Sequence, residues 1–193
     1  DEVLKVIKGG ASHDKIVGTD KAEHIKSGNG ADTVTAGGGN DKVELGAGND
    51  RADGEAGNDT VLGGNGVDQL YGGAGKDTIS GEADADSLFG GSENDTLSGG
   101  KGRDVIAGET GSDTLSGGKG ADWFLFMKKV EAGDFVKDFE KGDKIVVRAD
   151  DFDLGKGVLK KEFFSSGHDN TANDANDHFI WNADSHQLWY DSN

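Results

Sequence analysis

Acidic side chains recur at every ninth residue through most of this sequence, and this period constrains the fold more than any other feature. The register is unbroken, with Asp at every position except one Glu. The positions are Asp14, Glu23, Asp32, Asp41, Asp50, Asp59, Asp68, Asp77, Asp86, Asp95, Asp104, Asp113 and Asp122. A short fixed period is the signature of a repeat architecture, in which each repeat buries its apolar side by stacking on its neighbours.

The repeat itself covers residues 9–125, which is thirteen copies of nine residues. Good copies are GGNGVDQLY (63–71) and GGAGKDTIS (72–80), with Asp sixth and an apolar residue eighth. The eighth residue is apolar in every copy, from Ile16 to Phe124. Because side chains alternate along a strand, this pattern predicts a short strand whose middle residue points inward.

One copy is then a half-turn plus a strand, and two copies make a coil of 18 residues. We therefore expect an all-β parallel β-roll, a solenoid with two parallel sheets and two rows of stacked turns. Row one carries Asp14, Asp32, Asp50, Asp68, Asp86, Asp104 and Asp122. Row two carries Glu23, Asp41, Asp59, Asp77, Asp95 and Asp113.

The chemistry of the turns indicates calcium. Ca²⁺ takes six to eight hard oxygen ligands, which the Asp side chains and turn carbonyls supply. The predicted side-chain ligands are Asp32, Asp41, Asp50, Asp59, Asp68, Asp77, Asp86, Asp95, Asp104, Asp113 and Asp122. The predicted backbone ligands are Gly64, Gly66, Gly73, Gly75, Gly100, Gly102, Gly118 and Gly120. Glycine permits φ > 0 and removes side chains that would crowd an ion.

Some copies depart from the pattern. The first two (GGASHD and GTDKAE) lack most of the glycines, so Asp14 and Glu23 are only additional candidates, and we expect about eight to ten ions. Asp84 and Glu93 stand at the fourth position, where other copies have glycine, and an acid replaces the second glycine at Glu55, Glu82 and Glu109. These departures concern individual sites and not the pattern of the repeat.

Composition supports a cation partner. Asp and Glu number 37 against 20 Lys and Arg, a net charge of −17, which argues against nucleic acid as a partner. Cysteine is absent, and no apolar run is long enough to span a bilayer. One inward side chain per nine residues buries too little apolar surface to offset the entropy of ordering the chain and the repulsion of stacked carboxylates. We therefore expect folding to require Ca²⁺.

These motifs resemble the RTX, or haemolysin-type calcium-binding, repeat family. Residues 9–125 are similar to its parallel β-roll. Trp123-Phe124-Leu125-Phe126, GDFVKDFEKGDKIVV (133–147) and NDHFIWNADSHQLWYDSN (176–193) resemble the C-terminal regions of serralysin-type proteases, RTX lipases and rhizobial secreted RTX proteins. The resemblance implies an extracellular protein of a Gram-negative bacterium that leaves through the type I secretion machinery and folds outside, where Ca²⁺ is abundant.

Three parts are therefore expected: an N-terminal capping strand (1–8), the β-roll (9–125) and a mixed C-terminal cap and secretion-related region (126–193). No HExxH or GxSxG motif is present, so we expect no enzyme in this chain. Two interpretations stay open. The chain is a calcium-binding module of a larger secreted protein, consistent with its start at Asp1, or it is a stand-alone structural or adhesive protein.

One outer face of the predicted roll is apolar toward its C-terminal end. Its side chains include Tyr71, Phe89, Val105 and Trp123. An exposed apolar patch on a sheet usually binds something. We expect residues 126–193 to fold back over it, and the alternative is a carbohydrate or cell surface that stacks on Tyr71 and Phe89.

Overall fold

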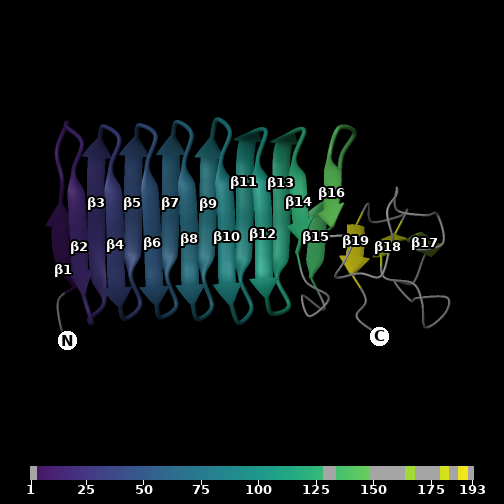
Figure 1. Ribbon diagram of the computed structural model, residues 1–193, viewed down its shortest axis with the longest axis horizontal. Helices are drawn as coiled ribbons and strands as arrows, with labels where there is room; N and C mark the ends of the chain where they lie inside the picture. The colour runs from purple at the N-terminus through teal and green to yellow at the C-terminus, as the bar shows by residue number, and fades with distance from the viewer. Residues whose placement is uncertain (1–3, 128–133, 148–163, 168–178, 183–186, 191–193) are drawn as a thin grey trace.

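The computed structural model is a long coil of short strands in two flat layers (Figure 1). It describes residues 4–127, 134–147, 164–167, 179–182 and 187–190, and the rest of the chain lies outside this description. Every regular element among the described residues is a strand.

The strands divide between two sheets by alternation along the chain. The first sheet has the order β1-β3-β5-β7-β9-β11-β13-β15-β19-β18-β17. Its strands are β1 (Lys5–Lys8), β3 (Glu23–Asn29), β5 (Lys42–Ala47), β7 (Thr60–Asn65), β9 (Thr78–Ala83), β11 (Thr96–Gly102), β13 (Thr114–Gly120), β15 (Phe135–Asp138), β19 (Gln187–Tyr190), β18 (Phe179–Asn182) and β17 (Phe164–Gly167).

The second sheet has the order β16-β14-β12-β10-β8-β6-β4-β2. Its strands are β2 (Lys15–Thr19), β4 (Thr33–Gly38), β6 (Arg51–Ala56), β8 (Gln69–Ala74), β10 (Ser87–Ser92), β12 (Val105–Thr110), β14 (Trp123–Phe126) and β16 (Lys144–Val147). All pairs from β1 to β16 are parallel, and within the repeats each residue pairs with the one 18 positions away, as Leu70 does with Leu88. The predicted all-β parallel β-roll with two sheets and two repeats per coil is confirmed.

The core is a single file of inward side chains between the sheets. The eighth residue of every repeat is buried, from Ile16 at 8% exposure to Phe124 at 0%. In the regular copies the first glycine is also inward, so each strand contributes one apolar side chain and one gap. Where that glycine is missing, Ala36 and Leu45 fill the position and are fully buried.

The parallel sheets extend beyond the repeat region, residues 9–125, at both ends. At the amino end β1 pairs in parallel with β3, which agrees with an initial strand. At the carboxyl end β15 pairs with β13 and β16 with β14, both parallel, so the two sheets continue past the last nonapeptide. β19 then pairs antiparallel with β15, which gives this end the expected mixed character.

The expectation that residues 126–193 fold back over the apolar face is wrong for their described strands. These strands extend the sheets along the roll axis instead (Figure 1). The physical reason is that β13 and β14 would otherwise expose unpaired backbone groups at a parallel edge, and pairing with β15 and β16 satisfies them. The remaining residues of 126–193 lie outside the described structure.

Candidate metal centres in two rows of carboxylates

The acidic side chains lie immediately before the strands and are stacked by backbone hydrogen bonds. The Asp of one coil uses its Oδ1 atom to accept the main-chain N–H of the acid 18 residues earlier. Asp68 N donates to Asp86 Oδ1 at 2.8 Å in row one, and Asp77 N donates to Asp95 Oδ1 at 2.8 Å in row two. Row one leads into the second sheet and row two into the first, so the rows lie along opposite edges of the roll. Each row is thus an ordered column of carboxylates.

The second oxygen of these carboxylates has no protein partner. The Oδ2 atoms are buried and accept no hydrogen bond, and every side chain concerned is at most 3% exposed. They belong to Asp32, Asp41, Asp50, Asp59, Asp68, Asp77, Asp86, Asp95, Asp104, Asp113 and Asp122. This set is identical to the predicted side-chain ligands. Because a buried carboxylate oxygen without a partner is costly, its repetition in every regular coil indicates a binding site for a cation.

The pKa values of the row acids in the metal-free fold also indicate a cation site. The pKa of Asp59, Asp86 and Asp95 is raised to about 7; burial is the largest cause, and the charges of neighbouring carboxylates contribute to the same rise. The hydrogen bond from the backbone of the preceding acid acts in the opposite direction. The pKa of Asp68 and Asp104 is raised to about 6, and burial is again the largest cause. Without a cation, the ionised form of these acids is therefore much less favoured than that of a free Asp side chain.

Glycine makes room for this column in two different ways. At the first position, a Cβ on Gly63 would lie 2.5 Å from Asp68 Oδ2, so here glycine provides space and not a positive φ. At the second and fourth positions the backbone does require glycine, with φ of 111° at Gly64 and 115° at Gly66. All eight predicted backbone-ligand glycines have φ between 87° and 158°. That their carbonyl oxygens coordinate an ion stays a prediction.

The donor set fits calcium. Within the described residues, no group of three or more His, Cys, Asp or Glu side chains converges on one point. A six- to eight-oxygen shell would therefore need backbone carbonyls in addition to one or two carboxylates. Carboxylate and carbonyl oxygens are the hard ligands that Ca²⁺ prefers, whereas zinc sites use Cys and His. The residues present match a column of calcium ions.

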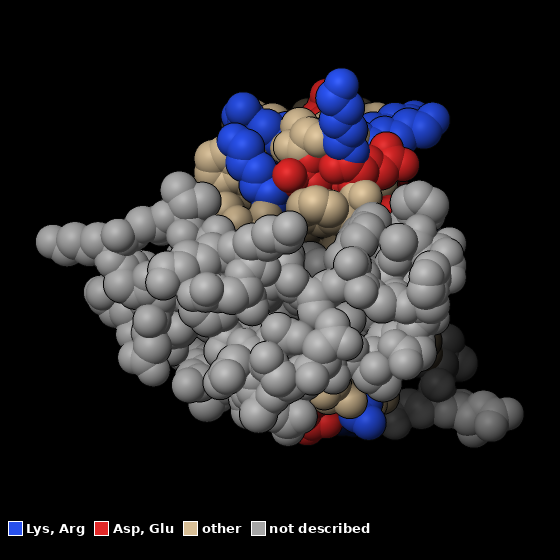
Figure 2. Space-filling view, turned by 90° about the vertical axis from the view of Figure 1, so that its right-hand side faces the viewer, with Lys and Arg blue, Asp and Glu red and all other residues tan. Residues whose placement is uncertain are grey.

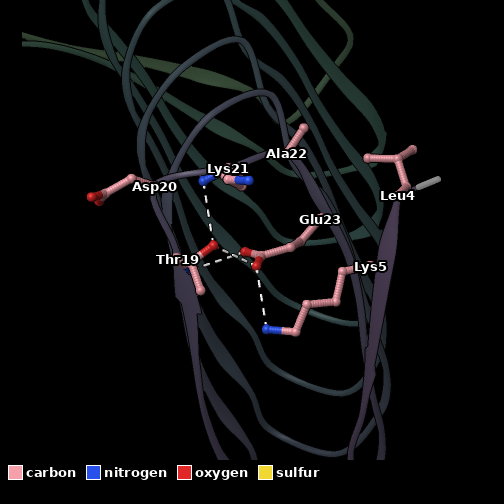
Figure 3. Close-up of a pocket in the computed structure, with 7 residues that line it drawn as sticks. All are labelled: Leu4, Lys5, Thr19, Asp20, Lys21, Ala22 and Glu23. Carbon is pink, nitrogen blue, oxygen red and sulfur yellow. Dashed lines mark hydrogen bonds and ion pairs between the residues drawn. The ribbon is translucent and has the colours of Figure 1, made fainter. Parts of the chain in front are cut away.

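The two additional candidates differ from the regular sites, because their carboxylates already have protein donors. Glu23 is 1% exposed and accepts hydrogen bonds from Thr19 N at 2.9 Å and Thr19 Oγ1 at 2.6 Å (Figure 3). Lys5 Nζ lies 3.5 Å from its Oε1 atom. Burial would raise the pKa of Glu23, but the Thr19 and Lys5 interactions hold it below its usual value. Asp14 Oδ2 accepts Gly10 N at 2.7 Å. Neither side chain needs a metal to be satisfied.

The rows also continue through two acids that the periodicity missed. Asp113 N donates to Asp134 Oδ1, and Asp122 N donates to Asp143 Oδ1, both at 2.9 Å. Both acids follow glycine and precede an apolar residue by two positions, in GDFV and GDKI. Their spacing of 21 instead of 18 hides them from a nine-residue period. Figure 2 looks onto this end of the roll, where acidic side chains at the upper edge lie among Lys and Arg side chains.

The apolar face forms a ladder of side chains that contact one another. The rings of Tyr71 and Phe89 stack at 5.0 Å with an angle of 11°, and the Arg51 guanidinium lies 4.2 Å from the Tyr71 centroid. Since β6 and β10 flank β8 on opposite sides, both faces of Tyr71 are covered. Trp123 is 37% exposed with Lys144 5.1 Å from its ring, and Val105 is half-buried. Carbohydrate stacking on Tyr71 is thus disfavoured, and a partner for this face stays a prediction.

Comparison with known families agrees with this geometry. The model of the RTX calcium-binding nonapeptide repeat, four copies long, matches residues 17–52, 26–61, 53–88, 62–97 and 89–124. These matches together span more than half of the chain, so the chain belongs to the RTX calcium-binding repeat family. No curated protein matches it. No helix among the described residues is long and apolar enough to cross a membrane.

The chain is therefore an RTX calcium-binding module whose Asp columns are of the kind that β-rolls use to bind Ca²⁺. Repeats of this family are typical of bacterial proteins that leave the cell by type I secretion.

Proposed function

We propose that this module is unfolded without calcium, passes through a type I secretion channel of a Gram-negative bacterium in that form, and folds outside as Ca²⁺ fills its two rows. The observation that carries the proposal is the column of buried Oδ2 atoms without partners. A fold that leaves so many carboxylate oxygens buried and unpaired is unstable until a cation neutralises them. Metal binding is then folding free energy.

The number of ions belongs to the same proposal. Each regular interval between stacked acids holds one ion, which gives about eight to ten once the first coils are set aside. Glu23 and Asp14 support this lower number, because protein donors already satisfy their carboxylates.

The module itself carries out binding and not catalysis, and it serves a larger secreted protein whose activity resides elsewhere. This is supported by the arrangement of the row acids. The acids that would have to form acid–base pairs for catalysis are held in the two columns by hydrogen bonds. A full reading frame with a catalytic domain joined to residue 1 supports this role, and a frame without any further domain contradicts it.

The test of folding is a calcium titration followed by far-ultraviolet circular dichroism. We expect an unfolded spectrum in chelator and a cooperative gain of β signal as Ca²⁺ is added. Mg²⁺ at the same concentration is the control, since it dehydrates reluctantly and prefers strict octahedral sites, and should produce little change. A chain with the same β spectrum in chelator and in Ca²⁺ would show the proposal to be wrong.

A further inference from the structure

Five described residues other than glycine have positive φ, and all five are acidic. They are Glu55, Glu82, Asp84, Glu93 and Glu109, with φ from 67° to 77°. Each stands where other repeats have glycine, and each side chain is exposed. A non-glycine residue in this region is strained, and such strain persists where it serves a function. Glycine would be the less strained choice at all five positions.

The five divide into two groups by position. Glu55, Glu82 and Glu109 occupy the second position of the repeat, and Asp84 and Glu93 occupy the fourth, two residues before the row Asp. Asp84 Oδ2 accepts a hydrogen bond from Gly66 N at 3.1 Å, so its carboxylate reaches back over the preceding turn of row one. This places it beside the interval between Asp68 and Asp86.

Glu93 holds the corresponding place in row two. It stands two residues before Asp95, as Asp84 stands two residues before Asp86, and both acids have a φ of 77°. The shared position and backbone conformation put the Glu93 carboxylate beside the interval between Asp77 and Asp95.

We propose that Asp84 and Glu93 set calcium affinity, and that they make the intervals Asp68–Asp86 and Asp77–Asp95 the tightest calcium sites of the roll. The proposal rests on the proposed function, since it concerns the ions that the two rows hold. On this proposal, the two acids that replace glycine in the repeat determine how tightly calcium binds.

The argument is one of charge. An ion between Asp68 and Asp86 faces two buried Oδ2 atoms without a protein partner and the Asp84 carboxylate beside them. Glu93 stands at the same repeat position for the interval between Asp77 and Asp95. Calcium affinity rises with the number of carboxylates around a site. The third acid acts as a nearby charge and not as a converging ligand, because no described trio of acids meets at one point. The two intervals lie in the middle of the roll, one in each row.

The experiment compares glycine substitutions at the two positions. Asp84→Gly and Glu93→Gly restore the usual residue and relieve backbone strain, so a purely structural role predicts unchanged or tighter calcium binding. The charge role predicts the opposite. From Coulomb attraction between Ca²⁺ and one carboxylate at about 8 Å in water, the tightest sites should weaken roughly three- to tenfold for each substitution. Competition with a chromophoric chelator at low ionic strength measures this, and circular dichroism checks that the variants fold.

Glu82→Gly is the matched control, because it removes the same charge and a similar strain, with a φ of 74° against 77°, at the second position of the repeat. It should leave the tightest sites unchanged. Asp84→Asn separates charge from strain, because it keeps the strained backbone and should weaken binding as Asp84→Gly does. The weakening should shrink at roughly 1 M KCl, where the Debye length is about 3 Å.

The possible failures are distinct. A wild-type chain that binds no Ca²⁺ contradicts the proposed function. A wild-type chain that binds Ca²⁺, with Asp84→Gly and Glu93→Gly binding as tightly or more tightly, overturns only this inference. Equal weakening by Glu82→Gly also overturns it, since the effect would then be one of net charge.

Discussion

Each regular Asp of the two rows uses its two oxygens for different purposes. Oδ1 fixes the stacking of coils by accepting an N–H, as Asp86 does from Asp68, and Oδ2 is left for a ligand. The sequence predicted which residues these are, because the period alone identifies them. It set Glu23 aside as an additional candidate only because the first copies lack glycines, and it missed the Thr19 and Lys5 donors, which are brought together only by the fold.

Protons and calcium should compete for the row carboxylates. The folded-state pKa of Asp59, Asp86 and Asp95 is about 7, above the value of about 3.9 for an unfolded chain. A raised folded pKa stabilises the metal-free fold fully below the unfolded pKa, and this stability is lost as pH rises through about 7. In chelator, the β signal in circular dichroism should therefore be larger at pH 5 than at pH 8. A larger β signal at pH 8 would contradict these pKa directions.

The first-position glycine should be essential where it borders a carboxylate. A Cβ on Gly72 would lie 2.4 Å from Asp77 Oδ2 and 2.6 Å from Gly90 O, so Gly72→Ala should weaken calcium binding and lower stability by about 1–3 kcal/mol. Thermal unfolding in Ca²⁺ measures the change.

Gly10→Ala is the control for that substitution. Its Cβ would meet nothing closer than Asp14 Oδ2 at 3.8 Å, and its φ lies outside the left-handed region. Its stability should change by only about 0.5 kcal/mol or less. Equal losses at the two glycines would show that space for the carboxylate is not the cause.

At the scale of strands, the nonapeptide predicted nearly all the regular structure. Its alternation gave one inward residue per copy, and the two sheets follow from the 18-residue coil. The prediction missed the continuation through β15 and β16, because a connection of 21 residues breaks the period and no glycine pair announces it. The expected fold-back failed for the described strands of 126–193, because an open parallel edge needs backbone partners, while Tyr71 and Phe89 already cover each other.

Asp134 should couple the end of the roll to the calcium column. It is 1% exposed, and its Oδ1 accepts Asp113 N. Asp134→Asn keeps this acceptor and removes one charge, so Ca²⁺ should bind the last coil of row two more weakly while the fold persists. Amide hydrogen exchange of the Asp134→Asn variant in Ca²⁺ should be faster in β13 and β15 than in β7. Uniform exchange along the roll of this variant would contradict the coupling.

Asp138→Asn is a useful comparison at the same end. Its carboxylate accepts Ser116 Oγ, Gly117 N and Gly118 N, so it is satisfied by protein donors. Its replacement should loosen β15 without a calcium-dependent effect on row two.

At the scale of the whole molecule, the roll is a column of negative charge around a thin apolar core. The net charge is −17, and the file of single inward side chains is the main source of hydrophobic stabilisation. A fold of this kind depends on its counterions more than an ordinary domain does, which suits the proposed export of an unfolded chain that folds outside the cell.

The most direct test of calcium binding in the two rows is a crystal structure of the protein crystallised in Ca²⁺, with anomalous scattering used to locate the ions. We predict peaks along both rows at 2.3–2.6 Å from Oδ2 of the regular Asp residues, with backbone carbonyl oxygens completing each shell. Glu23 should keep Lys5 and Thr19 as partners. A roll whose Oδ2 atoms are bonded to water or to lysine, with no anomalous peaks in the rows, would contradict the account.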